Sequence, residues 1–161
     1  MAEILRKTFE RAVKLLAAKP RSIAELRERL LRGRGTNAEV VETVIARLRE
    51  YGYLNDERFA FSYASYKVKQ KPVGRRRLER DLKFKKIDSG VANEALEMVY
   101  AETSEEQLID QAIAKRLRIR GKPKNRLEAK SLFDYLLRQG FAFELVSEKV
   151  RALATDYADE D

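Results

Sequence analysis

The chain has 161 residues, the size of one ordinary domain, and its composition already excludes several classes of protein. Hydrophobic residues make up 44% of it, enough for a packed core, while 3 Pro and 7 Gly are too few for a sandwich or barrel of many short strands. The absence of both Cys and His excludes disulfides, thiolate or imidazole metal sites and the usual catalytic triads. We therefore expect an all-α protein that is not an enzyme and has neither a cofactor nor a metal site.

The charge of the chain suits a polyanionic partner without proving one. Lys and Arg total 34 against 26 Asp and Glu, which gives a net charge of +8. The N-terminus is amphipathic and charged throughout, unlike a signal peptide, and no stretch approaches the ~20 apolar residues of a membrane span. We expect a cytoplasmic monomer that does not contact a membrane.

The predicted helices follow one another in three copies of one pattern. The first helix of each copy is predicted from the helical spacing of its apolar residues, at Ala2–Ala18, Asp56–Gln70 and Glu105–Arg120. In the first copy these apolar residues include Phe9, Ala12, Val13 and Leu16. The second helix follows a proline in each copy, and Pro20, Pro72 and Pro123 stand 52 and 51 residues apart. Its apolar positions correspond as Leu26 and Leu30, Leu78 and Leu82, and Leu132 and Leu136. The third helix has the apolar faces Val41, Ile45 and Leu48, then Ala92, Leu96 and Val99, then Val146, Val150 and Leu153.

Capping residues support these boundaries. Capping boxes are predicted at Ser22 with Glu25, Thr36 with Glu39, Ser104 with Gln107, and Asn125 with Glu128. Helix ends are predicted at Gly33, Gly52, Gly121 and Gly140. We expect three tandem three-helix modules, at residues 1–54, 55–102 and 103–155, stacked as an elongated, curved helical repeat rod. The acidic tail at 156–161 is expected to fray.

Two segments carry the positive charge. From Lys67 to Lys86 there are ten basic and two acidic residues, and from Lys115 to Lys130 there are eight basic and one acidic. A solvated helix face is the competing interpretation, but the first segment has too few acids to neutralise its bases. Gly121-Lys122 lacks the other residues of a phosphate-binding loop, so anion contact and a merely solvated turn both stay open there. The candidate binding residues are Lys71, Arg75, Arg76, Arg77, Arg80, Lys83, Lys85, Lys86, Lys115, Arg116, Arg118, Arg120, Lys122, Lys124 and Arg126.

Two motifs around the second module resemble the signature of a known family. They are the run Tyr51-Gly52-Tyr53-Leu54-Asn55-Asp56-Glu57-Arg58-Phe59-Ala60, and Arg75-Arg76-Arg77-Leu78 preceded by Lys71, Pro72 and Gly74. Together they are similar to the RecX family, bacterial regulators of the RecA recombinase, with Asn55 where Asp is common. From the residues themselves, we expect Gly52 to end a helix, Asn55 or Asp56 to cap the next, and Tyr51, Tyr53 and Leu54 to pack a junction between modules. Phe59 and Tyr63 should share a helix face in the core.

The resemblance implies a regulatory protein that binds the RecA–DNA filament and inhibits RecA ATPase and strand exchange. It also implies contact with single- and double-stranded DNA without sequence preference. The sequence leaves open whether the basic residues contact DNA phosphate or RecA carboxylates, and whether the chain lies in the filament groove or caps its end. The alternative function is a helix-turn-helix-like transcription regulator with a preferred duplex sequence.

Overall fold

The computed structural model describes residues 1–158, with side chains to residue 154, and all regular structure in that range is helical. The helices are α1 (Ala2–Ala18), α2 (Ile23–Leu31), α3 (Ala38–Glu50), α4 (Asp56–Gln70), α5 (Arg75–Phe84), α6 (Ser89–Glu102), α7 (Glu105–Arg120), α8 (Arg126–Arg138) and α9 (Phe143–Ala158). The first helix of each repeat, α1, α4 and α7, has the bounds predicted from the sequence. The all-α prediction is confirmed.

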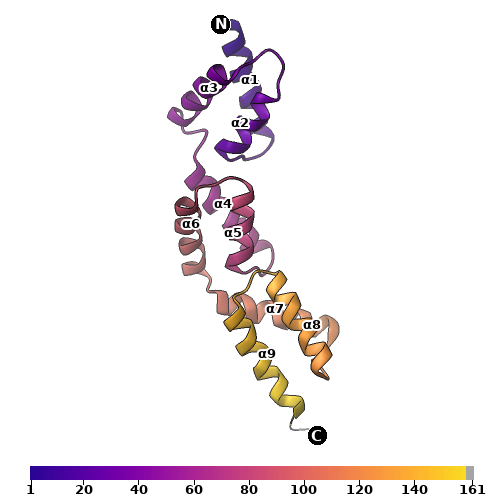
Figure 1. Ribbon diagram of the computed structural model, residues 1–161. Helices are drawn as coiled ribbons and strands as arrows, with labels where there is room; N and C mark the ends of the chain where they lie inside the picture. The colour runs from indigo at the N-terminus through magenta and orange to yellow at the C-terminus, as the bar shows by residue number, and fades with distance from the viewer. Residues whose placement is uncertain (159–161) are drawn as a thin grey trace.

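Each set of three consecutive helices encloses its own hydrophobic cluster. The equivalent residues Leu26, Leu78 and Leu132 are 0%, 0% and 4% exposed, which confirms the repeat of buried leucines. Four apolar positions lie further out than expected, because Val13 is exposed and Phe9, Leu16 and Leu153 are half-buried. The three clusters lie one after another along a bent, elongated molecule whose termini are at opposite ends (Figure 1).

Neighbouring clusters are in contact at their edges. Val68 and Tyr100 pack against both the second and the third cluster. The division of the chain into modules that end at residues 54 and 102 stays a prediction. Helix α9 runs through Ala158, so the first part of the acidic tail is helical, and residues 159–161 of it lie outside the described residues.

Most of the predicted helix starts are correct, and one is displaced by a residue. Ser22 and Ser104 form capping boxes, and the side chains of Asn55 and Asn125 accept backbone hydrogen bonds at the starts of α4 and α8. The box predicted at Thr36 is wrong because Asn37 caps α3 instead. The Thr36 hydroxyl is engaged by the Thr8 hydroxyl at 3.0 Å, which ties the loop to α1.

The box at Asn125 is half-formed: Glu128 accepts from the Lys124 N–H rather than from that of Asn125. Among the predicted helix ends, Gly52, Gly121 and Gly140 have positive φ, as expected, but Gly33 does not. At Gly33 the missing side chain instead leaves room for the Arg11 guanidinium, which donates to the carbonyl of Arg29 at 3.1 Å.

The joints between modules repeat one arrangement. At the first joint, the start of α2 lies against the end of α5, where the Ser22 hydroxyl donates to the Lys85 carbonyl at 2.8 Å. At the second, the start of α5 lies against the end of α8, where the Gly74 N–H donates to the Gln139 carbonyl at 2.8 Å. Helices α8, α5 and α2 therefore follow one another head to tail along the rod (Figure 1).

A carboxylate closes each joint in the same way. The first residue of α4, Asp56, accepts from the Ile23 N–H at 2.9 Å, and the carboxyl of the first residue of α7, Glu105, lies beside the backbone N–H groups of Arg75 and Ala142. Burial is the main cause that raises the pKa of both carboxyls above their ordinary values. Of the residues expected to pack the first joint, Leu54 is buried, but Tyr51 and Tyr53 are each 64% exposed. The expectation for the two tyrosines is therefore wrong.

Candidate functional site

The three adjacent arginines at the start of α5 have different surroundings. Adjacent residues point in different directions around a helix, so the three cannot share one environment. Arg76 is exposed, whereas Arg75 and Arg77 are half-buried. Arg75 pairs with Glu79 one turn later at 3.0 Å, and Arg77 donates to the Gln139 side chain at 2.9 Å. Arg77 is therefore part of the second joint.

The basic residues at the end of α5 approach the first module. Lys85 pairs with Glu25 at 3.6 Å and lies over the Tyr63 ring at 5.2 Å from its centroid. Lys86, which is more exposed, pairs with Glu28 at 3.7 Å. Arg80 and Lys83 are exposed and make no ion pair with the described residues. The end of α5 thus combines lysines used in the joint with cations that face solvent.

The two basic segments meet beside Lys71. The pKa of Lys71 is lowered, first by burial and then by the positive charges of Arg77, Lys115 and Lys67. Lys115 belongs to α7, whereas the others lie on α4, on α5 or between them, so the fold brings together residues that are far apart in the sequence. We call Lys67, Lys71, Arg77 and Lys115 the cationic cluster. Its mutual repulsion would be relieved by a bound anion.

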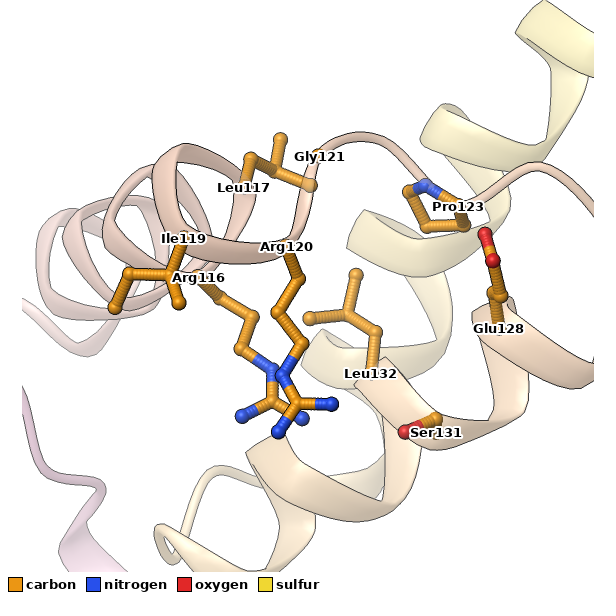
Figure 2. Close-up of a pocket in the computed structure, with 9 residues that line it drawn as sticks. All are labelled: Arg116, Leu117, Ile119, Arg120, Gly121, Pro123, Glu128, Ser131 and Leu132. Atoms are coloured by element: carbon orange, nitrogen blue, oxygen red, sulfur yellow. The ribbon is translucent and has the colours of Figure 1, made fainter.

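The second basic segment surrounds the turn between α7 and α8. Six of its seven candidates are exposed, namely Lys115, Arg118, Arg120, Lys122, Lys124 and Arg126. The seventh, Arg116, is half-buried, and its guanidinium carbon lies 4.4 Å from the centroid of the Tyr135 ring. A cavity of about 450 Å³ opens beside the turn, and Arg116 and Arg120, which both line it, extend their side chains in the same direction (Figure 2). Glu128 lies apart from them, near Pro123 (Figure 2).

One exposed aromatic residue among these cations was missed in the sequence. Phe84 is 89% exposed and follows Lys83 at the end of α5. The signal was available, because position 84 lies off the stripe of Leu78 and Leu82 that faces the core. A single exposed apolar side chain is common on protein surfaces, so Phe84 by itself does not mark a contact with a partner.

Other kinds of site are not found in the part of the chain that the structure describes. No group of acidic side chains there is arranged to hold a metal ion. None of the helices described is long and apolar enough to cross a bilayer.

Comparison with known proteins identifies the family. A model described as the first three-helix domain of RecX matches residues 9–48, and one described as the second three-helix domain of RecX matches residues 55–96. The regulatory protein RecX of Bacillus velezensis is 35% identical over 161 residues, which cover 98% of this chain and 58% of that protein. That of Amycolatopsis mediterranei is 31% identical over 153 residues, which cover 92% and 86% of the two chains. The chain thus spans about three fifths of the length of its Bacillus relative.

Solved structures share the fold. The crystal structure of RecX from Lactobacillus salivarius superimposes with a TM-score of 0.82 at 20% identity, covering 96% of this chain and 99% of the other. A second crystal structure of regulatory protein RecX gives a TM-score of 0.79 at 21% identity and covers 94% and 73% of the two chains. The resemblance seen in the two motifs is confirmed, and the chain belongs to the RecX family, whose members are regulatory proteins rather than enzymes.

Proposed function

We propose that this chain binds a RecA filament on DNA and restrains ATP hydrolysis and strand exchange by bridging successive protomers. The observation that carries the proposal is the repeated joint, which fixes three modules in one elongated rod. Such a rod presents a long surface that suits an extended partner better than a small ligand. We keep residues 1–54, 55–102 and 103–155 as the proposed modules and a monomer as the active form.

The basic surfaces supply the proposed contacts with the filament. The cationic cluster and the arginines beside the turn between α7 and α8 place positive charge on two neighbouring modules. Arginine pairs well with phosphate or carboxylate through its planar fork, and phosphate contacts carry no sequence information. We therefore propose contact with single- and double-stranded DNA without sequence preference, together with acidic surface on RecA.

The testing experiment titrates the chain into RecA that is hydrolysing ATP on single-stranded DNA. We expect hydrolysis to fall as the chain is added, and strand exchange to fall with it. Inhibition at far below one chain per protomer would indicate capping of filament ends, whereas inhibition at higher ratios would indicate binding along the groove. The proposal fails if a molar excess at low salt neither binds the filament nor changes the rate of hydrolysis.

The helix-turn-helix alternative predicts a basic helix that enters the major groove of DNA. In a three-helix module that helix is the third one, but α6 has no Lys or Arg and exposes Glu94, Glu97 and Glu102. The second module contains most of the first basic segment, but its third helix is therefore unsuitable as a recognition helix in the major groove. Binding of one duplex sequence ~10³-fold or more above random DNA would nevertheless favour the alternative.

A further inference from the structure

A groove of about 710 Å³ lies at the first joint, between the end of α1, the start of α2 and one face of α4. Aromatic side chains line it, namely Tyr53, Phe59, Tyr63 and Tyr66. Basic side chains also line it, namely Lys19, Arg21, Arg58, Lys67 and Lys85. Its volume is within the range of sites that hold small organic ligands. The groove thus combines flat rings with positive charge; Lys67 and Lys85 come from the first basic segment, whereas Lys19, Arg21 and Arg58 lie outside both segments.

The aromatic residues form a continuous stripe on α4. Phe59, Tyr63 and Tyr66 follow at intervals of four and three residues, so they share one face of the helix. The rings of Phe59 and Tyr63 are nearly parallel, with their centroids 6.1 Å apart. These two rings are half-buried, and Lys85 lies over both of them. They form the floor of the groove.

The other two tyrosines have ring surface available for a ligand. Tyr66 is 61% and Tyr53 is 64% exposed, so the fold does not use most of either ring for packing. Tyr51 is equally exposed but does not line this groove. Large aromatic rings left open in a groove, rather than scattered over the surface, indicate a ligand with a flat face.

The cations around the groove are fixed and mostly uncompensated. Arg58 donates to the Gly52 carbonyl at 2.7 Å, and Arg21 donates to the Leu15 carbonyl at 3.3 Å. Each guanidinium has five N–H groups, so donors remain for a ligand. Among the described residues that line the groove, Glu25 supplies the acidic charge, and it pairs with Lys85 at 3.6 Å. The groove therefore attracts an anion.

We infer that this groove binds single-stranded DNA, with an unpaired base stacked on Tyr66 or Tyr53 and the flanking phosphates beside Arg21 and Arg58. Stacking of bases on aromatic side chains in a positively charged groove is the general mode of binding single strands. The bases of a duplex are covered by their neighbours and cannot stack in this way. An acidic peptide would satisfy the cations but would leave the open faces of Tyr53 and Tyr66 without a flat partner. The inference rests on the proposed function for the source of the strand, which is the DNA of the filament.

The test measures binding of bare DNA, without RecA. The probe is a labelled oligothymidylate about eight nucleotides long, compared with an abasic oligonucleotide of the same length that keeps the phosphates. Because the chain has 7 Tyr and no Trp, quenching of its intrinsic fluorescence reports stacking on tyrosine. We expect oligothymidylate to bind more tightly than the abasic strand and to quench this emission.

Variants assign the effect to the groove. At least one of Tyr66→Leu and Tyr53→Leu should weaken binding of oligothymidylate by about 5- to 150-fold, the range for loss of one stacked base, and both should leave binding of the abasic strand unaffected. Tyr66→Phe keeps the ring and should bind like the unchanged chain. The control is Tyr51→Leu, which removes an equally exposed ring outside the groove. Because the Tyr51 ring meets that of Tyr53 edge-on with centroids 6.3 Å apart, its loss should weaken binding far less than the loss of a stacking ring.

Three outcomes would overturn the inference. They are equal affinity for the abasic strand, unchanged binding by both leucine variants, and tighter binding of a glutamate-rich peptide that contains one phenylalanine. The last would assign the groove to an acidic protein segment. None of them bears on the RecA hydrolysis assay, so failure of the groove and failure of the proposed function are distinguishable.

Discussion

Replacing Gly74 with alanine should open the second joint without disturbing either module. Gly74 precedes α5 with φ −84° and ψ 158°, a backbone conformation that alanine adopts freely. A Cβ at this position would nevertheless overlap the carbonyl carbon of Gly140 and the backbone nitrogen of Phe141. Because both are main-chain atoms, neither can move aside as a flexible side chain would. The substitution therefore tests close contact between the two helix ends rather than backbone strain.

The expected magnitude follows from the hydrogen bonds that the overlap would break. They are the Gly74 N–H to the Gln139 carbonyl at 2.8 Å, the Arg76 N–H to the Gly140 carbonyl at 3.1 Å, and Arg77 to the Gln139 side chain at 2.9 Å. Each contributes about 0.5–1.5 kcal/mol, so their joint loss should lower the free energy of unfolding by about 1.5–4.5 kcal/mol. The leucines of each core are untouched, so helix content should stay the same.

The assay combines urea unfolding, followed by circular dichroism, with small-angle scattering. A compact globule of this length would have a radius of gyration of about 15 Å, and the rod should exceed it. Gly74→Ala should change the scattering profile because the third module is no longer held in place. Gly90→Ala is the control: Gly90 is exposed in the first turn of α6, and a Cβ there would lie 3.1 Å from the Asp88 carboxylate, a side chain that can shift, so stability should change by less than about 1 kcal/mol. Unchanged stability and scattering in Gly74→Ala would refute the reasoning.

Three further predictions concern the joints, the cores and the basic surface. Asp56→Ala should lower the free energy of unfolding by about 1–3 kcal/mol because it leaves the Ile23 N–H without its acceptor, whereas Asp56→Asn keeps an acceptor and should cost less. Burial raises the pKa of Asp56 in the folded chain, so the unfolded chain loses this proton at a lower pH than the folded chain does, and stability should fall as pH rises from about 4 to the folded pKa. Chemical unfolding of Asp56→Asn at several pH values should lack that part of the decline. The same pH profile in Asp56→Asn and in the unchanged chain would contradict this prediction. Substitution of Leu26, Leu78 or Leu132 by alanine should cost about 2–5 kcal/mol each in thermal or urea unfolding, and near-neutral results at two of them would undo their equivalence. Arg76→Ala should flatten the dependence of log K on log salt for bare DNA by roughly one unit without loss of stability, and an unchanged slope would assign Arg76 to RecA or to solvent.

The helices and their cores were predictable because local patterns determine them. Capping residues such as Ser22 and Ser104 act within a single turn, and the leucine pairs of the second helices follow the helical period. The error at Thr36 has a tertiary cause, since its hydroxyl is taken up by Thr8, which lies 28 residues earlier. Local signals fail where a distant residue offers a better partner.

The joints were not predictable in the same way. Ser22 and Lys85 are 63 residues apart, and Arg77 and Gln139 are 62 apart, so no periodicity connects them. The sequence marked Arg75, Arg76 and Arg77 as candidate binding residues, but which of them enters a joint depends on how two modules are oriented. The same orientation brings Lys115 next to Lys71. Basic segments were therefore recognisable, whereas their convergence was not.

The head-to-tail order of α8, α5 and α2 gives a physical reason for a stiff rod. A helix leaves unpaired N–H groups at its start and unpaired carbonyls at its end. At the second joint, backbone N–H groups at the start of α5 donate to carbonyls at the end of α8, and at the first joint the Ser22 hydroxyl donates to the Lys85 carbonyl in their place. The dipoles of the three helices also point the same way, so the positive end of one faces the negative end of the next. Bending at a joint would separate the paired donors and carbonyls. It would also move the carboxyl of Asp56 or Glu105 away from the backbone N–H groups beside it. Under the function proposed above, a filament whose subunits rearrange during hydrolysis would have to break such contacts in every bound chain. The joints would then supply the restraint, and the basic surfaces would determine where the rod binds.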